Sequence, residues 1–274
     1  MTANEGAGHA ASDSADLGRR CELLRSLHVP GTPLPLPNAW DVASASAVVA
    51  AGFPVVATTS GGVAAALGYE DHEHAPGDEM LAAAARICRS VDAPVTVDAE
   101  AGYGMEPAEL VAALQRVGAA GCNLEDTNHA TRELRDPAQH AGWLRDVREA
   151  ASDASYELVI NARIDVFLSA LLSGAGAGTQ PGLVTEALER ARAYVEAGAD
   201  SVFPIALWEN DALRAFVAEA PAPVNVLKTP RAPSLSELAK LGVARISYGS
   251  LLHRDAMEQF AGVLRSIADE ANGQ

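Results

Sequence analysis

The chain has 274 residues, an apolar fraction of 49% and a formal net charge of −16. This length suffices to bury a sizeable core, in one barrel or two small domains. The negative charge disfavours nucleic acids and anionic membrane surfaces as partners. It leaves room for a small anionic substrate, because a bound metal ion or an arginine can reverse the field within a cleft.

The beginning of the chain and its cysteines indicate a cytoplasmic protein. Residues 1–16 are small and polar, and we predict a disordered tail there. They lack the apolar segment of a signal peptide, and no run in the sequence is long enough to span a bilayer. The cysteines lack metal-site or disulfide spacing. Cys88 and Cys122 lie in apolar patterns, which favours buried residues over nucleophiles.

From residue 34 onward, short apolar runs alternate with amphipathic helical patterns. We expect strands near 34–38, 54–58, 94–98, 121–125, 157–162, 199–203, 223–227 and 243–247. We expect helices over 17–27, 41–51, 77–90, 106–118, 138–151, 183–197, 209–219, 234–241 and about 252–270. This alternation predicts an α/β fold, a single (β/α)8 TIM barrel over residues 17–274. The alternative, a doubly wound sheet, would carry a GxGxxG turn that is not present.

Two connections are longer than the turn between a strand and its helix requires. Residues 126–137 are polar and include His129, Arg132 and Arg135. A long polar loop after a strand is typical of an active-site lid. Residues 173–182 are rich in glycine and are expected to form a flexible insertion.

The segment Val95–Gly104 carries two acids at the end of a predicted strand. In an extended strand Asp98 and Glu100 would point to one face. Two adjacent carboxylates repel each other unless a cation lies between them or one of them is protonated. A hard divalent cation such as Mg²⁺ matches oxygen ligands.

Further polar residues follow the other predicted strands, where a barrel of this kind places its active site. They are Trp40, Ser60, Gly61, Gly62, Glu125, Arg163 and Asn225. Acids around one ion, opposite an arginine, can bind a small carboxylate. Other interpretations remain open: Asp41 suits a helix N-cap, Ser60 a tight turn, and Arg163 an ion pair with Asp165. His72 and His74 suit either an exposed loop or a metal site.

Five phrases, in order, resemble the isocitrate lyase/phosphoenolpyruvate mutase superfamily. They are Pro37-Asn-Ala-Trp-Asp-Val-Ala-Ser44, Thr58-Thr-Ser-Gly61, Val97-Asp-Ala-Glu-Ala-Gly-Tyr-Gly104, Asn123-Leu-Glu-Asp126 and Asn161-Ala-Arg163. The resemblance spans about residues 34–250. It implies a Mg²⁺-dependent barrel, with Mn²⁺ as a possible substitute, that acts on 2-keto or 2-hydroxy carboxylates through an enolate.

The resemblance also implies roles for individual residues. Asp98 would bind the metal directly, Glu100 and Glu125 would hold the metal or its waters, and Asp71 would join through water. Trp40 would lie against the substrate, while Ser60 and the amides of Gly61 and Gly62 would bind its oxygens. Arg163 would bind the carboxylate, and His129 is a candidate proton donor.

Two departures from the superfamily narrow the reaction. The Lys-Lys/Arg-Cys-Gly-His segment of the isocitrate and methylisocitrate lyases is absent. Thr127 follows Glu125-Asp126 where the mutases have lysine, and the predicted lid contains no lysine. We therefore expect a lyase or decarboxylase of a small 2-keto or 2-hydroxy (di)carboxylate.

Three alternatives to this activity remain. They are a phosphonopyruvate-type P–C hydrolase or mutase-like enzyme, a Schiff-base aldolase using Lys228, and a non-catalytic binding barrel. The resemblance also implies a homodimer or homotetramer, for which the apolar pattern of residues 256–267 is suitable.

Overall fold

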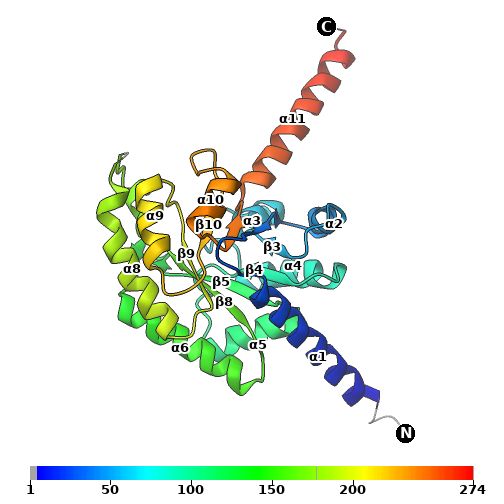
Figure 1. Ribbon diagram of the computed structural model, residues 1–274. Coiled ribbons are helices and arrows are strands. Elements are labelled where there is room, and N and C mark those ends of the chain that lie inside the picture. Colours follow the sequence, from blue (N-terminus) through cyan, green and yellow to red (C-terminus); the bar gives the residue numbers. More distant parts are fainter. Residues whose placement is uncertain (1–4, 177, 274) are drawn as a thin grey trace.

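The apolar runs form parallel strands in the computed structural model, which describes residues 5–176 and 178–273 (Figure 1). The strands are β1 Leu34–Leu36, β2 Asn38–Ala39, β3 Val56–Thr58, β4 Val95–Asp98, β5 Gly121–Glu125, β8 Val159–Ile164, β9 Ser201–Pro204, β10 Asn225–Leu227 and β11 Arg245–Ser247. β1 and β2 are halves of one barrel strand separated at Pro37, which has no N–H for a ladder.

The strands close into a ring. β1 pairs with β11 and β2 with β3, and the order continues through β4, β5, β8 and β9. A bridge between Val202 and Val224 joins β9 to β10, which pairs with β11. This arrangement confirms the predicted (β/α)8 barrel.

Helices cover the outside of the barrel. They are α2 Val42–Ala50, α3 Ser60–Leu67, α4 Gly77–Ser90, α5 Pro107–Val117, α6 Pro137–Asp153, α7 Val166–Leu172, α8 Gln180–Glu196, α9 Asn210–Glu219 and α10 Leu235–Leu241. α5 and α10 end at Gly118 and Gly242 with φ of +80° and +94°, the left-handed conformation that glycine adopts without strain. These turns return the chain to the next strand.

Two helices, α3 and α7, are additional to those expected. Glycine disfavours helix, so Ser60-Gly-Gly suggests a turn in the sequence. In the structure a Cβ at Gly61 would approach Asp71 Oδ2 to 2.6 Å, and one at Gly62 would approach Thr59 Cγ2 to 2.7 Å. Close packing therefore requires both glycines within the first turn of α3.

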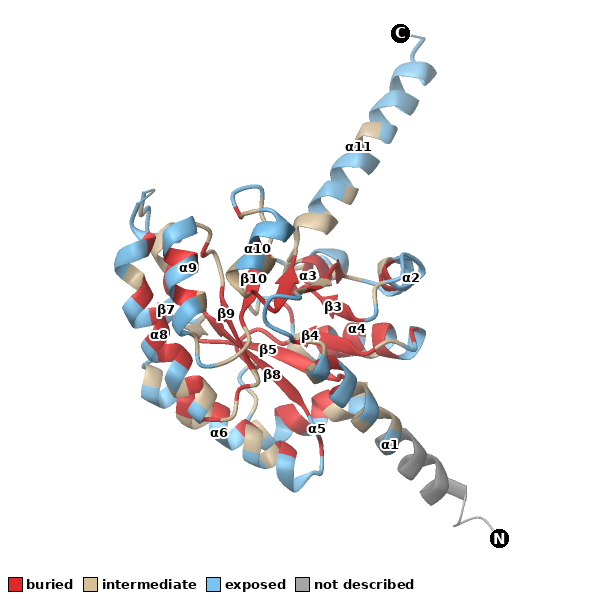
Figure 2. Ribbon diagram, in the orientation of Figure 1, coloured by how far each residue is buried: buried red, intermediate tan, exposed pale blue. Residues whose placement is uncertain are grey.

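The two terminal helices differ in how they contact the barrel. α1 spans Glu5–Ser26, so it overlaps the predicted tail of residues 1–16, of which residues 1–4 lie outside the described part. Leu24 of α1 is buried beside Gly121, and Arg25 Nε donates to Asp200 Oδ1 at 2.9 Å. These two contacts hold α1 across the N-terminal end of the barrel. α11, Leu251–Ala271, projects away from the barrel and has no buried residue (Figures 1 and 2).

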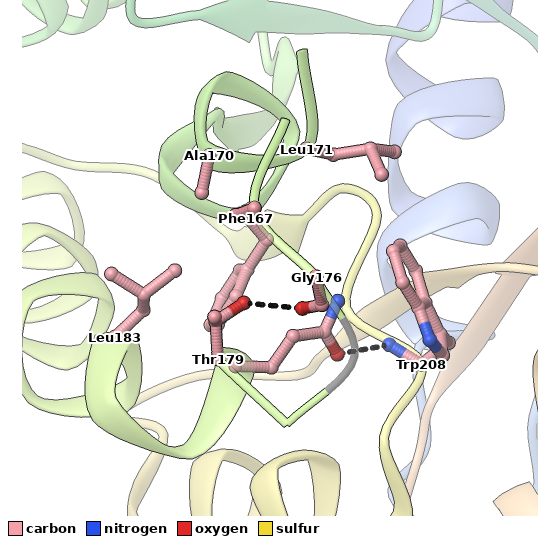
Figure 3. Close-up of a pocket in the computed structure, with 9 residues that line it drawn as sticks. Phe167, Ala170, Leu171, Gly176, Thr179, Leu183 and Trp208 are labelled. Carbon is pink, nitrogen blue, oxygen red and sulfur yellow. Dashed lines mark hydrogen bonds between the residues drawn. The ribbon is translucent and has the colours of Figure 1, made fainter. Parts of the chain in front are cut away.

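Both long connections contain hydrogen-bonded structure. The predicted lid, residues 126–137, forms an antiparallel hairpin of β6 Thr127–Asn128 and β7 Glu133–Leu134. In the expected insertion of residues 173–182, Thr179 Oγ1 donates to the carbonyl of Gly176, and the buried Gln180 accepts from the amide of Trp208 (Figure 3). The cavity beside them measures only about 10 Å³, the space of about one water.

No helix within residues 5–176 and 178–273 combines the length and apolarity required to cross a membrane. The barrel core is filled by fully buried aliphatic side chains such as Leu36, Leu124 and Ile246. This rigid scaffold presents the strand ends, with their polar residues, at one end of the barrel.

Candidate active site

A cavity of about 210 Å³ opens at the C-terminal end of the barrel. One side of the wall is lined by Asp71, Asp98, Asn123 and Arg163. Glu100 and Glu125 lie behind these residues, and we call all six together the acid side. Four apolar residues, which we call the apolar side, line another part of the wall: Leu168, Phe203, Ile205 and Leu227. The rest of the wall consists of Asn38, Thr59, Ser60, His72, Ser247, Gly249 and Ser250. The cavity is smaller than sites for drug-sized ligands and suits a small substrate.

Asp98 is the last residue of β4 and is held by three hydrogen bonds. Its amide donates to Thr58 Oγ1 at 2.9 Å, and its Oδ2 accepts from the amide of Ser60 at 2.9 Å. Asn123 Nδ2 donates to Oδ1 at 3.4 Å. Asn123 is a site residue that the sequence analysis missed; its position two residues before Glu125, on the same strand face, was the available signal.

Glu100 lies on the acid side because of a turn in the backbone, and not because it continues the strand as expected. β4 ends at Asp98, and Glu100 has a φ of +48°, so the two acids do not share a strand face. The turn nevertheless brings them together: burial, and next the charge of Asp98, raises the pKa of Glu100 to about 8. Glu100 Oε2 accepts from the amide of Glu73 at 2.6 Å.

Asp71 and Glu125 each bury a carboxylate oxygen that lacks a hydrogen-bond partner. Glu125 Oε2 forms a close ion pair with Arg163 Nη1. Its Oε1 lies 2.5 Å from His129 Nε2, without the alignment of a hydrogen bond. Burial raises the pKa of Glu125 well above its ordinary value, against the opposing charge of Arg163. An unpartnered buried oxygen of this kind is what a cation would satisfy.

The acid side fits a hydrated divalent cation better than a closed protein cage. Within the described residues, no group of three His, Cys, Asp or Glu side chains is assembled as a metal site. Mg²⁺ does not need one, because it keeps several waters and binds through one or two carboxylates. Asp98 with Asp71 or Glu125 could supply these ligands, and the cation would offset the mutual repulsion that raises the pKa of Glu100.

Arg163, at the cavity wall, is held from behind. Its Nε and Nη2 donate to the two oxygens of Asp165 at 2.7 and 2.9 Å. Thr127 Oγ1, in the lid hairpin, donates to Asp165 Oδ2 at 2.5 Å. The ion pair with Asp165 anticipated from the sequence is therefore present, and it fixes the guanidinium rather than removing it from the cavity.

Ser60 lies on the cavity wall, but three other expected substrate-binding residues do not. Trp40 lines a separate groove beside α2, where its ring packs edge-on against His253 at 5.0 Å. Gly61 and Gly62 pack against Asp71 and Trp40 within α3. Their amides belong to the first helical turn and have no acceptor within the helix.

Asn225 is also not on the cavity wall, because it belongs to a buried polar layer below. It donates to Ser247 Oγ at 3.3 Å. In the same layer Arg245 Nη2 donates to Asn123 Oδ1 at 3.1 Å, and burial lowers the pKa of Arg245 to about 10. Arg245 remains a cation and, through Asn123, supports the position of Asp98. Asn225 was expected at the cavity because strand bounds are uncertain by a residue or two.

The histidines and the remaining nucleophile candidates are placed as follows. His72 lies on the cavity wall, with its ring centroid 5.4 Å from that of His129. His74 Nδ1 contacts the backbone oxygen of Asp71 at 2.5 Å. Lys228 Nζ donates to backbone carbonyls of its own loop, at 3.0 and 3.3 Å, and does not line the cavity.

The cysteines are buried, as expected, and burial raises the pKa of Cys88 and of Cys122 to about 12. Asp41 is an N-cap whose Oδ1 accepts from the amide of Ser44 at 2.7 Å. These residues are therefore structural.

Comparison with known proteins agrees with the geometry. The family model for phosphoenolpyruvate phosphomutase matches residues 24–268. An uncharacterised protein of Mycobacterium tuberculosis is 34% identical, over 90% of this chain and 89% of its own length. A 2-methylisocitrate lyase assigned in Corynebacterium glutamicum is 31% identical, over 96% of this chain and 85% of its own.

Solved structures share the fold. A Burkholderia cenocepacia protein provisionally named a phosphonomutase is 42% identical with a TM-score of 0.83, over 90% of this chain and 99% of its own. Phosphonopyruvate hydrolase in complex with oxalate and Mg²⁺ is 23% identical with a TM-score of 0.78, over 92% and 88% of the two chains. The chain therefore belongs to the phosphoenolpyruvate phosphomutase family, and its curated relatives include proteins named as lyases and mutases.

Proposed function

We propose that the protein is a Mg²⁺-dependent lyase that cleaves a C–C bond in a small 2-keto or 2-hydroxy carboxylate through an enolate. One observation carries the proposal: Asp98 and Asp71, with an unpartnered carboxylate oxygen on Asp71, line a cavity that Arg163 also lines. The carboxylates can bind a hard cation, and the arginine beside them can bind the carboxylate of the substrate. Together they form a receptor for small 2-keto or 2-hydroxy acids.

Asp98, with Asp71 and Glu125, would hold the Mg²⁺ ion. When bound, the ion would polarise a carbonyl oxygen and stabilise negative charge as the bond breaks. Arg163 would orient the substrate carboxylate, because Asp165 fixes its guanidinium by two hydrogen bonds. Ser60, at the start of α3, lies on the cavity wall, and its hydroxyl group would donate a hydrogen bond to a substrate oxygen.

His72 and His129 are the candidates for proton transfer. Both lie beside the acid side, and His72 lines the cavity. Burial lowers the pKa of His72, which favours the neutral imidazole that can accept a proton. The lysine and cysteine chemistry of the mutases and methylisocitrate lyases has no counterpart among the cavity-lining residues that the structure describes.

We also propose that the protein forms a homo-oligomer through α11. Met257, Phe260, Val263, Leu264 and Ile267 are each about half exposed on this projecting helix. Such a stripe on a helix that contacts little of its own barrel is typical of a protein interface. Sedimentation of the full chain and of the variant Phe260→Asp tests this, since the variant should shift towards the monomer.

The experiment that tests the proposed function is a substrate panel with Mg²⁺, repeated with EDTA. Pyruvate, CO₂ and phosphate release would be measured for 2-keto, 2-hydroxy and phosphonate acids. We expect C–C cleavage that EDTA abolishes and Mg²⁺ restores. Phosphate release from phosphonopyruvate alone would assign the alternative P–C hydrolase, and turnover that EDTA leaves unchanged would contradict the metal's role.

A further inference from the structure

The loop of residues 68–76, between α3 and α4, brings Asp71 and His72 to the cavity wall. Two consecutive residues of this loop, His72 and Glu73, adopt φ of +71° and +58°. Residues with a side chain adopt this left-handed conformation where the surrounding structure enforces it. Contacts with the rest of the protein are therefore needed to hold the loop in its shape.

Glu73 supplies two such contacts, one from its backbone and one from its side chain. Its amide donates to Glu100 Oε2 at 2.6 Å, and its Oε1 accepts from the amide of Tyr103 at 2.7 Å. Glu100 and Tyr103 lie in the turn after β4 and also adopt positive φ, of +48° and +56°. Two strained segments are thus joined by a reciprocal pair of hydrogen bonds, to which each segment contributes one amide.

Packing holds the loop on either side of these bonds. A Cβ at Gly77, the first residue of α4, would approach the Cβ of Tyr103 to 2.6 Å. Ala75 is buried in a small apolar cluster of α3 and α4 residues, and Tyr103 packs against this cluster. Asp71 Oδ2 lies against Gly61 of α3. The end of the loop is therefore fixed by packing, and its middle, beside Asp71, is fixed by the hydrogen bonds of Glu73.

From these contacts we propose that Glu73 is a positioning residue that holds Asp71 at the metal site of the acid side. This rests on the proposed function and deepens it, because Glu73 is not among the residues that line the cavity. Asp71 buries a carboxylate oxygen without a partner. Such an oxygen serves a cation only from a fixed position, which residues behind the ligand provide. Glu73 acts through Asp71 and does not contact the cation or the substrate.

Mn²⁺ binding to the full chain, measured by electron paramagnetic resonance, tests the proposal. Glu73→Ala removes the acceptor of the Tyr103 amide, and we expect Mn²⁺ affinity to fall about tenfold or more, as when a residue that orients a ligand is lost. Glu73→Gln removes the charge but keeps an oxygen for the same amide, so its Mn²⁺ affinity should stay within about threefold of the wild type.

Glu70→Ala is the matched control, because it removes an exposed acid of the same loop. Its Mn²⁺ affinity should also stay within about threefold of the wild type, since solvent and salt screen an exposed charge. Glu73→Asp is the second test variant, for use if Glu73→Ala does not fold. Its side chain is shorter and would not reach the Tyr103 amide, so the same loss of affinity is expected.

A double-mutant cycle separates positioning from a general structural role. Asp71→Ala removes the carboxylate through which Glu73 is proposed to act. In that background Glu73→Ala should change Mn²⁺ affinity by less than about twofold, because the effects of coupled residues are not additive. Hydrogen exchange gives a readout without metal: residues 68–76 and the Tyr103 amide should exchange faster in Glu73→Ala than in the wild type or Glu73→Gln.

The outcomes separate this inference from the proposed function. Wild-type Mn²⁺ affinity in Glu73→Ala, an equal loss with and without Asp71, or unchanged hydrogen exchange would overturn the inference and leave the metal site standing. If the wild-type protein itself does not bind Mn²⁺, the proposed function is contradicted, and the inference fails with it.

Discussion

The two sides of the cavity differ in how they are held in place. The acid side lies at the ends of β4 and β5 and in the loops after α3 and β4, where Glu100, Tyr103, His72 and Glu73 adopt positive φ. The apolar side lies on β9, β10, α7 and the residue that follows β9, and none of its four residues adopts a positive φ. Backbone strain in non-glycine residues persists where surrounding structure enforces it, and it gathers at functional sites. We therefore expect the strained side to carry the chemistry and the apolar side to contact the substrate.

The largest expected effect is on the acid side. Asp98→Ala removes the central carboxylate and the acceptor of the Ser60 amide. We expect Mg²⁺ affinity, measured by competition with Mn²⁺, to fall by about 100-fold or more, with loss of turnover. Asp41→Ala is the matched control: it removes an exposed acid that caps α2, and should cost only about 1 kcal/mol of stability. If Asp98→Ala bound the metal as tightly as the wild type, the acid side would not be the metal site.

Arg163→Lys tests the boundary between the two sides. Lysine keeps the charge but cannot form the two parallel hydrogen bonds to Asp165. We expect kcat/KM to fall about thirtyfold while Mg²⁺ affinity stays within about threefold. Arg192→Lys, an exposed pair with Glu219, serves as control. An unaltered kcat/KM would show that the guanidinium does not position the substrate.

Leu227→Ala tests the apolar side. The truncation removes apolar surface from the cavity wall, so 2-ketopentanoate, which has an alkyl tail, should bind about tenfold more weakly while pyruvate binds as before. Calorimetry measures both affinities, and Leu235→Ala, exposed on α10, is the control. Equal weakening for pyruvate would indicate a general structural effect instead of loss of the tail contact.

The smallest expected effect is a change in the free energy of unfolding with pH, caused by His28. This residue lies outside both sides of the cavity, so its effect can be separated from that of the acid side. Its two nitrogens are buried without partners, and burial lowers its pKa to about 3. As the pH falls, His28 is therefore protonated in the unfolded chain at a higher pH than in the folded protein. The stability that the folded protein gains from burying the neutral imidazole is present above about pH 6.5 and is lost as the pH falls towards 3. Between pH 7.5 and 6.0 the loss should be about 1 kcal/mol.

Urea unfolding of the wild type and of His28→Gln at the two pH values measures this loss. The variant should lose about 1 kcal/mol less than the wild type over the same interval, because glutamine does not titrate. Identical pH dependence in the two proteins would assign the acid sensitivity to other groups, including the carboxylates of the acid side.

Most of the barrel and part of the site could be predicted from the sequence. Strand periods and glycine C-caps are local signals, and so the ring of strands was predictable. Asp98, Glu125 and Arg163 follow from their positions at strand ends. α3 could not be predicted, because packing around Gly61 and Gly62 overrides their helix propensity. The apolar side was missed because Phe203 and Leu227 resemble ordinary core residues until the structure shows that they line a cavity.

The lid and the assembly remain predictions. The hairpin of β6 and β7 carries Thr127, which bonds to Asp165 and so connects this segment to Arg163. This contact is a route by which movement of the hairpin could reach the substrate carboxylate. No local pattern predicts this contact, because the two residues lie on different βα units and meet only when the barrel closes.

The most direct measurement of the central claim is the anomalous scattering of Mn²⁺ in crystals of the full chain grown with MnCl₂. We predict one strong peak beside Asp98, within coordination distance of Asp71 or Glu125 directly or through ordered water. A peak elsewhere, for example at His72 and His74, or no peak beside Asp98 at saturating Mn²⁺, would contradict the assignment of the acid side as the metal site.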